Sequence, residues 1–273
     1  QRTVILVDAA GGRVVADFQP KGATELSAAL IGPPALPAGQ GLVVLATATR
    51  SALEVAEAYR RAFLELGVGR VSTLAADDRQ KASAPRSVDL VEEASAVFFT
   101  GGDQLRITSL LGGTPLDDAI RRLYWRGGLV AGTSAGASAL GEWMVVEGPR
   151  DDCPRRCTIK LAPGLGLLRG AIVDQHFSQR GRLGRLLAAV AQNPRVLGIG
   201  VDEDSAITVG PDRIVEALGS GAVTIVDGRE MDHVNVSEQE ADKPLALGNV
   251  KLHVLAPGCR FDLKRRAVIP RRD

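Results

Sequence analysis

Short apolar runs alternate with amphipathic segments along most of this chain. The runs lie at 42–46, 70–75, 96–99 and 128–131, and their length is typical of strands covered on both faces of a parallel sheet. The segments between them carry apolar residues at helical spacing, and we predict helices at 53–66, 88–94, 104–111 and 115–126. Strand and helix in repeated alternation predict an α/β fold: a doubly wound, mostly parallel sheet with helices on both faces.

The pattern changes after about residue 206. Four β-rich runs follow, at 207–209, 214–217, 223–226 and 252–255, separated by turn signals such as Gly210-Pro211. We predict a β-rich, antiparallel C-terminal extension over about 206–270 that belongs to the same domain. A length of 273 residues suits one large α/β domain and is short for two, so residues 1–273 are expected to form a single domain.

Two further segments carry predictions about structure. The short apolar stretch within residues 1–8 indicates a strand rather than a signal sequence. Residues 143–163 are long, polar and proline-containing, which in compact domains is typical of a functional loop.

Composition excludes several classes of protein. Hydrophobic residues make up 45% of the chain and charged residues 24%, which is ordinary for a globular protein. The 33 basic and 32 acidic residues leave a net charge of +1, and aromatic residues make up only 4%, so we expect no nucleic-acid partner. No apolar run approaches the roughly 20 residues of a membrane span, so we expect no membrane association.

The cysteines give a mild indication of compartment. Cys153, Cys157 and Cys259 are an odd number, which argues against a secreted disulfide framework and favours a reducing, cytoplasmic location. The chain begins without Met, so export stays open as an alternative. Cys153 and Cys157 have a C-x3-C spacing, but no second pair of ligands accompanies them, and no metal site is expected.

The strongest chemical signal is the G-x-S-x-G motif around Ser134. It follows a predicted strand and precedes a helical segment, the context in which such a turn exposes a nucleophilic serine. Gly132 and Gly136 remove the Cβ atoms that a sharp strand-to-helix turn would crowd, and the N–H of Ala135 could face a developing oxyanion. The alternative is a glycine-rich turn in which Ser134 merely caps a helix; the strand–turn–helix context favours a nucleophile.

A serine nucleophile needs a base and an acid that orients it. His176 ends an apolar run, so we expect it at the carboxyl end of a strand, where α/β sheets place their sites. The acid is one of Asp202, Glu203 and Asp204, which end another run; the residues alone do not choose among the three. The order serine, histidine, acid disfavours an α/β-hydrolase esterase, in which the acid precedes the histidine, and a serine at the turn disfavours a glutaminase, which uses cysteine.

Two more clusters flank these residues. Gly101-Gly102 follows the strand at 96–99, and the Gly102 N–H could be the second oxyanion donor; the alternative is a plain turn capped by Asp103. Arg180, Arg182 and Arg185 follow His176 within a few residues. Guanidinium groups suit carboxylate recognition, although a bare arginine cluster is often only a solvated helix face.

Several segments together resemble the cyanophycinases, serine peptidases of the family that also contains the aspartyl dipeptidase peptidase E. The similarity covers about residues 42–265 in order, and several motifs together are far more specific than G-x-S-x-G alone. The matching stretches are 98–108, 132–137, 174–177, 180–186, 200–204, 253–255 and 260–264.

The resemblance implies specific roles and a specific reaction. It implies an αβα sandwich, a homodimer, and no cofactor or metal. It implies cyanophycin as the substrate, a polyaspartate with arginine on each β-carboxyl. The implied reaction releases β-aspartyl-arginine dipeptides from this polymer. It implies Ser134 as nucleophile, His176 as base and Glu203 as orienting acid. The substrate contacts that it implies are Gln104, Asp174, Gln175, Arg180, Arg182 and Arg185.

One region departs from the family. A Gly-Gly-Ala-Glu-Asp-Lys stretch usually follows the first strand, and neither residues 8–12 nor residues 21–25 match it. Two alternatives to a cyanophycin hydrolase stay open: an aspartyl dipeptidase that acts on short peptides, and a binder of acidic or arginyl peptides that has kept the motif without activity.

Overall fold

Strands outnumber helices in the part of the chain that the computed structural model describes, residues 4–8, 40–65, 67–149 and 153–270. The strands, in chain order, are β1 Val4–Asp8, β2 Gly41–Leu45, β3 Arg70–Leu74, β4 Ala96–Phe99, β5 Leu129–Thr133, β6 Gly141–Glu147, β7 Lys160–Pro163, β8 Leu168–Gln175, β9 Leu197–Val201, β10 Ser205–Val209, β11 Ile214–Gly219, β12 Val223–Asp227, β13 His233–Val234, β14 Leu247–Gly248, β15 Lys251–Leu255, β16 Arg260–Asp262 and β17 Ala267–Ile269. The helices are α2 Ala52–Glu65, α3 Arg79–Ser83, α4 Pro85–Glu92, α5 Gln104–Leu111, α6 Pro115–Trp125, α7 Ala135–Ala139 and α8 Leu183–Gln192, with a 3₁₀ turn, η1, at Ser178–Arg180.

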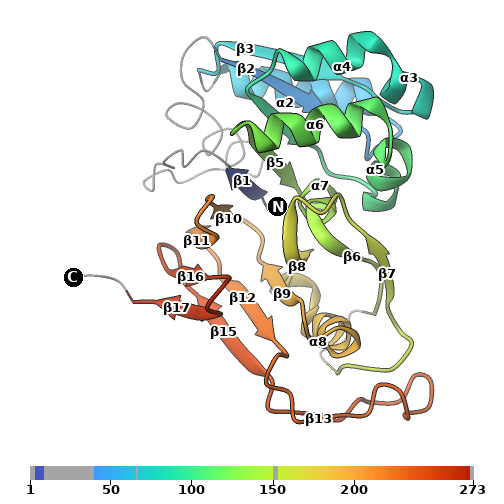
Figure 1. Cartoon of the computed structure of the whole chain (residues 1–273), viewed down its shortest axis with the longest axis vertical. Helices are drawn as coiled ribbons and strands as arrows, with labels where there is room; N and C mark the ends of the chain where they lie inside the picture. Colours follow the sequence, from blue (N-terminus) through green and yellow to red (C-terminus); the bar gives the residue numbers. More distant parts are fainter. Residues whose placement is uncertain (1–3, 9–39, 66, 150–152, 271–273) are drawn as a thin grey trace.

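All of these strands except β13 and β14, which pair with each other, form two large sheets (Figure 1). The first has the order β17-β16-β11-β10-β1-β5-β4-β2-β3, and the second has the order β15-β12-β9-β8-β6-β7. The strands that precede the candidate site residues are parallel to a neighbour: β4 pairs with β5 and β8 pairs with β9 in parallel. Parallel strands end at the same edge, so the turns that follow them lie together.

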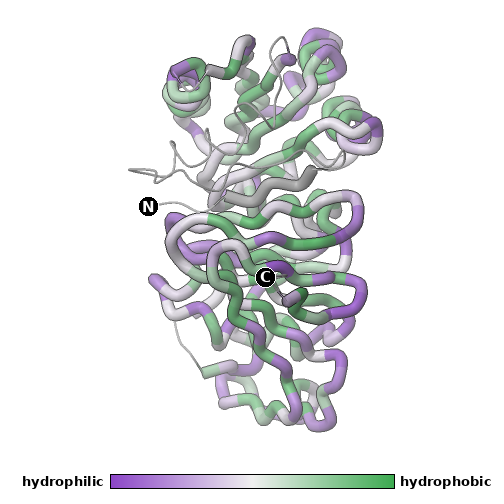
Figure 2. The backbone as a smooth tube through the Cα atoms, turned by 90° about the vertical axis from the view of Figure 1, so that its left-hand side faces the viewer, coloured by the Kyte–Doolittle hydropathy of each residue, from purple (hydrophilic) through white to green (hydrophobic). Residues whose placement is uncertain are grey.

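Helices cover both faces of the first sheet. Leu42 and Val44 of β2 belong to the core cluster that contains Tyr59 and Phe63 of α2. The intervening Val43 belongs to the cluster on the other face, which contains the buried residues of α5 and α6. Alternate side chains of one strand thus enter different layers, and this confirms the predicted α/β sandwich. Figure 2 shows hydrophobic segments running through the interior, with hydrophilic segments gathered at the outer turns.

Most predicted elements are confirmed, with small shifts at their ends. The helix expected at 88–94 begins at Pro85, because proline fits the first turn of a helix, and a short helix, α3, precedes it. The C-terminal extension is antiparallel as predicted, except that β10 also pairs with β1 in parallel. Its strands divide between both sheets: β10, β11, β16 and β17 join the first, and β12 and β15 join the second.

The loop expected at 143–163 is wrong at both ends. Trp143 lies within β6, and β7 ends at Pro163, so the two ends of the segment are strands of a hairpin. The described residues between them, 148–149 and 153–159, lie outside any helix or named strand, as the loop prediction has it. Met144 and Val145 are buried in different core clusters, so both faces of β6 are covered there, while the charged residues at 147 and 160 form an exposed ion pair. The polar, proline-containing stretch between the two strands masked the strand signal in the sequence.

The N-terminal prediction is tested only in part. Residues 4–8 form strand β1, which pairs with β5 and β10. The unmatched stretches at 9–12 and 21–25 lie outside the described residues. Within the described residues, no helix combines the length and the apolar character that crossing a membrane requires.

Candidate active site

Ser134 occupies a strained turn between β5 and α7. Its φ of 53° and ψ of −116° lie in a region that non-glycine residues rarely adopt. The turn is tight because a Cβ on Gly136 would collide with the carbonyl of Phe99, and a Cβ on Gly132 would collide with the backbone of Gly136. Small residues at both positions therefore allow the serine to project from the end of β5, as the motif predicts.

A continuous chain of hydrogen bonds joins three polar side chains at this edge. The Oγ of Ser134 lies 3.1 Å from Nε2 of His176. The Nδ1 of His176 lies 2.9 Å from Oε1 of Glu203. His176 directly follows β8 and is buried, and Glu203 lies just beyond β9. A serine, an imidazole and a carboxylate in this order have the geometry of a nucleophile, a base and an orienting acid.

The turn after β9 separates the three acids that the sequence left undecided. Glu203 alone of the three hydrogen-bonds to His176 in the described structure. Asp202 instead accepts the N–H of Ser178 at 3.0 Å and the N–H of Ala222 at 3.3 Å. In return, the Oε1 of Gln179 accepts the N–H of Glu203 at 3.0 Å. These reciprocal bonds tie the segment after His176 to the turn that carries Glu203.

Backbone N–H groups lie beside the serine on both sides. Ala135 is the first residue of α7, and its N–H has no acceptor within the helix. On the other side, Gly101 would place a Cβ within 3.3 Å of the Ser134 Cβ, so the turn after β4 runs close to the serine. Gly102 has a φ of 144°, and a Cβ there would collide with the carbonyl of Ala48, so glycine fits this position.

The electrostatics of the site favour a neutral imidazole. Burial lowers the pKa of His176 below its ordinary value, and the positive charge of Arg180 lowers it further. The hydrogen bond to Glu203 opposes both effects and raises this pKa, but it does not outweigh them. A lowered pKa keeps His176 unprotonated, and so able to accept a proton, to lower pH.

A cavity of about 330 Å³ opens over these groups. Four of the residues that the sequence analysis assigned to a site line it: Gly102, Ser134, His176 and Arg180. Gly101 lines it beside Gly102, and the lining is completed by Thr49, Val55 and Tyr59, which were not predicted from the sequence. Thr49 lies shortly after the buried strand β2, so the rule that sites gather at carboxyl ends of strands could have found it.

The remaining arginines lie behind the cavity, where they bind an acid of the same chain. Asp174 is buried, and it accepts hydrogen bonds from Arg185, whose Nε lies 2.6 Å from Oδ2, and from Arg182, at 3.2 Å. Arg182 also binds the side chain of Gln175 at 3.0 Å. Both arginines are themselves buried. This differs from the expectation that Asp174, Gln175, Arg182 and Arg185 face substrate, because a buried carboxylate needs such partners.

Gln104 is also engaged within the chain. It begins α5, and its Nε2 donates to the carbonyl of Val145 in β6 at 2.9 Å. The other two histidines lie elsewhere: His233 is exposed in β13, and His253 lies in β15 with its ring 5.1 Å from that of Phe261. Within the described residues, no group of three histidine, cysteine or acidic side chains is placed to hold a metal ion, and Cys153 and Cys157 form no disulfide.

Comparison with known proteins finds cyanophycinases in sequence and a peptidase in structure. The chain is 40% identical to the cyanophycinase of a Nostoc species over 230 residues, which cover 84% of this chain and 77% of the relative. It is 39% identical to the cyanophycinase of Geminocystis herdmanii over 82% of each chain, and 37% identical to that of Synechococcus elongatus over 82% of this chain and 70% of the relative. The crystal structure of a peptidase from an acI-B1 Actinobacterium shares the fold, with a TM-score of 0.60 and 22% identity over 91% of this chain and 96% of that one.

A family model gives the same result. Residues 39–217 match the model of peptidase family S51, and this range contains the serine, the histidine and the glutamate described above. The match spans more than half of the chain, and the relatives cover most of it. The chain is a serine peptidase that belongs to peptidase family S51.

Proposed function

We propose that this protein hydrolyses cyanophycin and releases β-aspartyl-arginine dipeptides. The observation that carries the proposal is the unbroken chain of hydrogen bonds from Ser134 through His176 to Glu203, in a chain 40% identical to a cyanophycinase. The polymer is a polyaspartate backbone with an arginine on each β-carboxyl, so the bond to be cleaved is an amide between aspartyl residues.

The first half of the reaction acylates the serine. His176 accepts the Ser134 proton on Nε2 while Oγ attacks the backbone carbonyl carbon, and Glu203 stabilises the imidazolium that forms. The N–H groups of Gly102 and Ala135 hold the oxyanion of the tetrahedral intermediate. His176 then gives its proton to the leaving amine as the carbon–nitrogen bond breaks, which leaves an ester on Ser134.

The second half regenerates the enzyme. Water attacks the ester carbonyl as His176 takes one of its protons at Nε2. The tetrahedral intermediate collapses with release of a carboxylate product, and the proton on His176 returns to the Ser134 oxygen. The lowered pKa of His176 favours this cycle at neutral pH, because the imidazole must be unprotonated at the start of both halves.

We propose different roles for the arginines that follow His176. Arg180 lines the cavity beside Ser134, so its guanidinium is placed to bind a carboxylate of the substrate. Asp174, Arg182 and Arg185 form the buried network behind it, and with Gln175 and Gln104 they hold the wall of the site. These are positioning residues: they act through His176 and the cavity wall.

One assay tests the substrate directly. The purified chain is incubated with cyanophycin, and released β-aspartyl-arginine is measured by chromatography and mass spectrometry; the Ser134→Ala variant is the control. Release by the wild type and none by the variant supports the proposal. Cleavage of short aspartyl peptides without action on the polymer would instead make the chain a dipeptidase, and no cleavage of either would make it a binder.

We propose two further properties, an oligomeric state and a compartment. The resemblance implies a homodimer, which sedimentation of the purified chain at several concentrations tests. None of the three cysteines forms a disulfide in the described structure, which accords with a reducing compartment, and we propose the cytoplasm. Fractionation of the source cells would test that location.

A further inference from the structure

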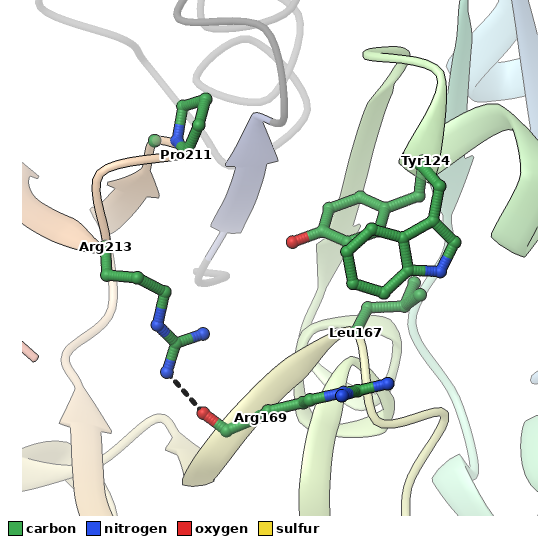
Figure 3. A pocket seen from close by; sticks show the side chains of 7 residues that line it. Tyr124, Leu167, Arg169, Pro211 and Arg213 are labelled. Atoms are coloured by element: carbon green, nitrogen blue, oxygen red, sulfur yellow. Dashed lines mark hydrogen bonds between the residues drawn. The ribbon is translucent and has the colours of Figure 1, made fainter. Parts of the chain in front are cut away.

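A second cavity lies at the opposite end of the strands that lead to the active site (Figure 3). Its volume is about 520 Å³, within the range of small-molecule sites. Trp125 ends α6, just before β5, whereas Ser134 follows β5. Arg169 likewise lies at the start of β8, whereas His176 follows it. The lining residues are Tyr124, Trp125, Leu167, Arg169, Gly210, Pro211 and Arg213.

The cavity combines aromatic surface with positive charge. Trp125 is 63% exposed, and the guanidinium carbon of Arg169 lies 5.6 Å from the centroid of its ring. Figure 3 shows the Arg213 side chain on the other side of the cavity, where it donates to the carbonyl of Arg169. Two guanidinium groups thus face one opening that also offers an indole and a phenol ring.

The positive charge in this cavity is not neutralised by the described part of the chain. None of the lining residues is acidic, and the Arg169 guanidinium has no hydrogen-bond acceptor or carboxylate partner among the described residues. Two acids next to lining residues in the sequence or by contact bind backbone instead: Asp212 accepts the N–H of Ile214 at 3.0 Å, and Glu142 accepts the N–H of Gly170 at 2.7 Å. A ligand with a carboxylate would therefore complete the pairing.

We propose that this cavity is a second binding site for the polymer, which takes a β-aspartyl-arginine unit distant from the bond being cleaved. The α-carboxylate of that unit pairs with Arg169 and Arg213, and the methylene stem of its arginine lies along Trp125 and Tyr124. The proposal rests on the proposed function, since it takes its ligand from the same polymer.

The position of the cavity sets the minimum length of a substrate that can reach both sites. Strand β5 has five residues that rise about 3.3 Å each, so its two ends lie roughly 17 Å apart. Trp125 lies near one end and Ser134 follows the other. A backbone that advances about 3.5 Å per residue needs at least roughly five repeat units to reach from one site to the other. The cavity should therefore strengthen binding of substrates long enough to reach both sites, and it should not affect turnover of shorter ones.

The first test measures binding without turnover. The chain has two tryptophans, so Ser134→Ala combined with Trp143→Phe leaves Trp125 as the only indole. Titration with β-aspartyl-arginine should change the fluorescence of Trp125 and saturate. The further change Arg169→Met, which removes no hydrogen bond found in the described structure, should weaken this binding about tenfold. A fluorescence signal that does not respond to the dipeptide, or that Arg169→Met leaves intact, would overturn the proposal.

The second test compares substrate lengths in the active enzyme. For Arg169→Met and Trp125→Leu, the ratio of kcat/KM on long cyanophycin to kcat/KM on a two-unit fragment should fall about tenfold. Arg229→Met and Val254→Ala are matched controls at exposed positions elsewhere, and they should keep the wild-type ratio. Equal losses on both substrates would contradict a second site.

Sedimentation separates the remaining outcomes. If Trp125→Leu converts an oligomer into a monomer at the same concentration, the cavity is an interface between copies and the proposal fails. If the wild type does not cleave cyanophycin at all, the proposed function fails, while the titration still reports whether the cavity binds a carboxylate-bearing dipeptide.

Discussion

Two pairs of arginines lie at opposite ends of the same strands, in opposite situations. At the carboxyl end, Arg182 and Arg185 are buried and both bind the carboxylate of Asp174. At the amino end, Arg169 is exposed, and with Arg213 it faces an open cavity without an acidic lining residue. Burial and partners, rather than residue type, decide what each pair does.

The contrast has a chemical reason. Catalysis needs groups held in one geometry, and the carboxyl end supplies this through strained turns at Ser134 and His176, whose φ values are 53° and 51°, and through a buried ionic network. Recognition of a long polymer needs exposed surface, and the amino end supplies aromatic rings and unneutralised guanidinium groups. We expect variants at the two ends to differ in kind as well as in size.

The largest effect is expected for Ser134→Ala at the catalytic end. Loss of a triad serine typically lowers kcat by about 10⁶, and the fold should persist because only one hydroxyl is removed. Turnover of cyanophycin and thermal unfolding are measured in parallel. Retention of more than a tenth of wild-type turnover would show that Ser134 is not the nucleophile.

Glu203→Gln should have the next largest effect. The amide keeps the shape of the side chain but favours the wrong imidazole tautomer and does not stabilise the imidazolium, for which a loss of about 10⁴ has precedent. Asp204→Asn is the matched control, because Asp204 has no hydrogen bond to His176 in the described structure and should lose far less.

A double variant sharpens this prediction. If the three residues act as a unit, Ser134→Ala combined with Glu203→Gln should be no slower than Ser134→Ala alone. Additive losses would mean that Glu203 acts on another step, and equal losses from Asp204→Asn and Glu203→Gln would mean that the wrong acid has been chosen.

The arginine comparison itself is tested by one substitution at each end. Arg185→Met leaves the buried Asp174 without its best partner and should lower the free energy of unfolding by about 3–5 kcal/mol. Arg169→Met removes an exposed side chain and should change the free energy of unfolding by less than about 0.5 kcal/mol. Denaturant-induced unfolding measures both.

Substrate preference distinguishes the two arginines further. Arg185→Met should lower activity on cyanophycin and on a small activated ester by the same factor, since the buried network supports His176. A loss of activity confined to the polymer would mean that Arg185 takes part in substrate recognition. Equal losses of stability in Arg185→Met and Arg169→Met would contradict the assignment of a structural role to one arginine and a binding role to the other.

The smallest expected effect is a shift in the pH profile. Arg180→Gln removes a positive charge that lowers the pKa of His176, so that pKa rises. The base form then exists only at higher pH, and the acid limb of kcat/KM on a small uncharged ester should move to higher pH. Arg180→Lys keeps the charge and should keep the limb in place; a limb that moves equally in both variants, or in neither, would contradict this electrostatic role.

The sequence was most informative where local backbone geometry determines the structure. Gly132 and Gly136 predicted the turn at Ser134, because the crowding that they relieve depends on neighbouring residues. The position of His176 followed from the rule that the carboxyl ends of parallel strands meet. Family resemblance then singled out Glu203 among three adjacent acids, which residue type alone could not do.

Other features depend on tertiary contacts that no local pattern encodes. Asp174 and Arg185 lie eleven residues apart, and their mutual burial follows from how α8 packs beside β8. The division of the C-terminal strands between two sheets likewise depends on which edges were free to pair, so it was not predicted. The strand at Trp143 was missed because it leads directly into a polar, proline-containing stretch.

Covalent labelling tests the central claim most directly, that one serine at this edge of the sheet carries out the chemistry. The purified chain is treated with a fluorophosphonate, and the modified peptide is identified by mass spectrometry. We predict one adduct per chain, on Ser134, with labelling strongly slowed by His176→Ala and absent from Ser134→Ala. An adduct on a different residue, or cyanophycin cleavage that persists after Ser134 is fully modified, would contradict the account.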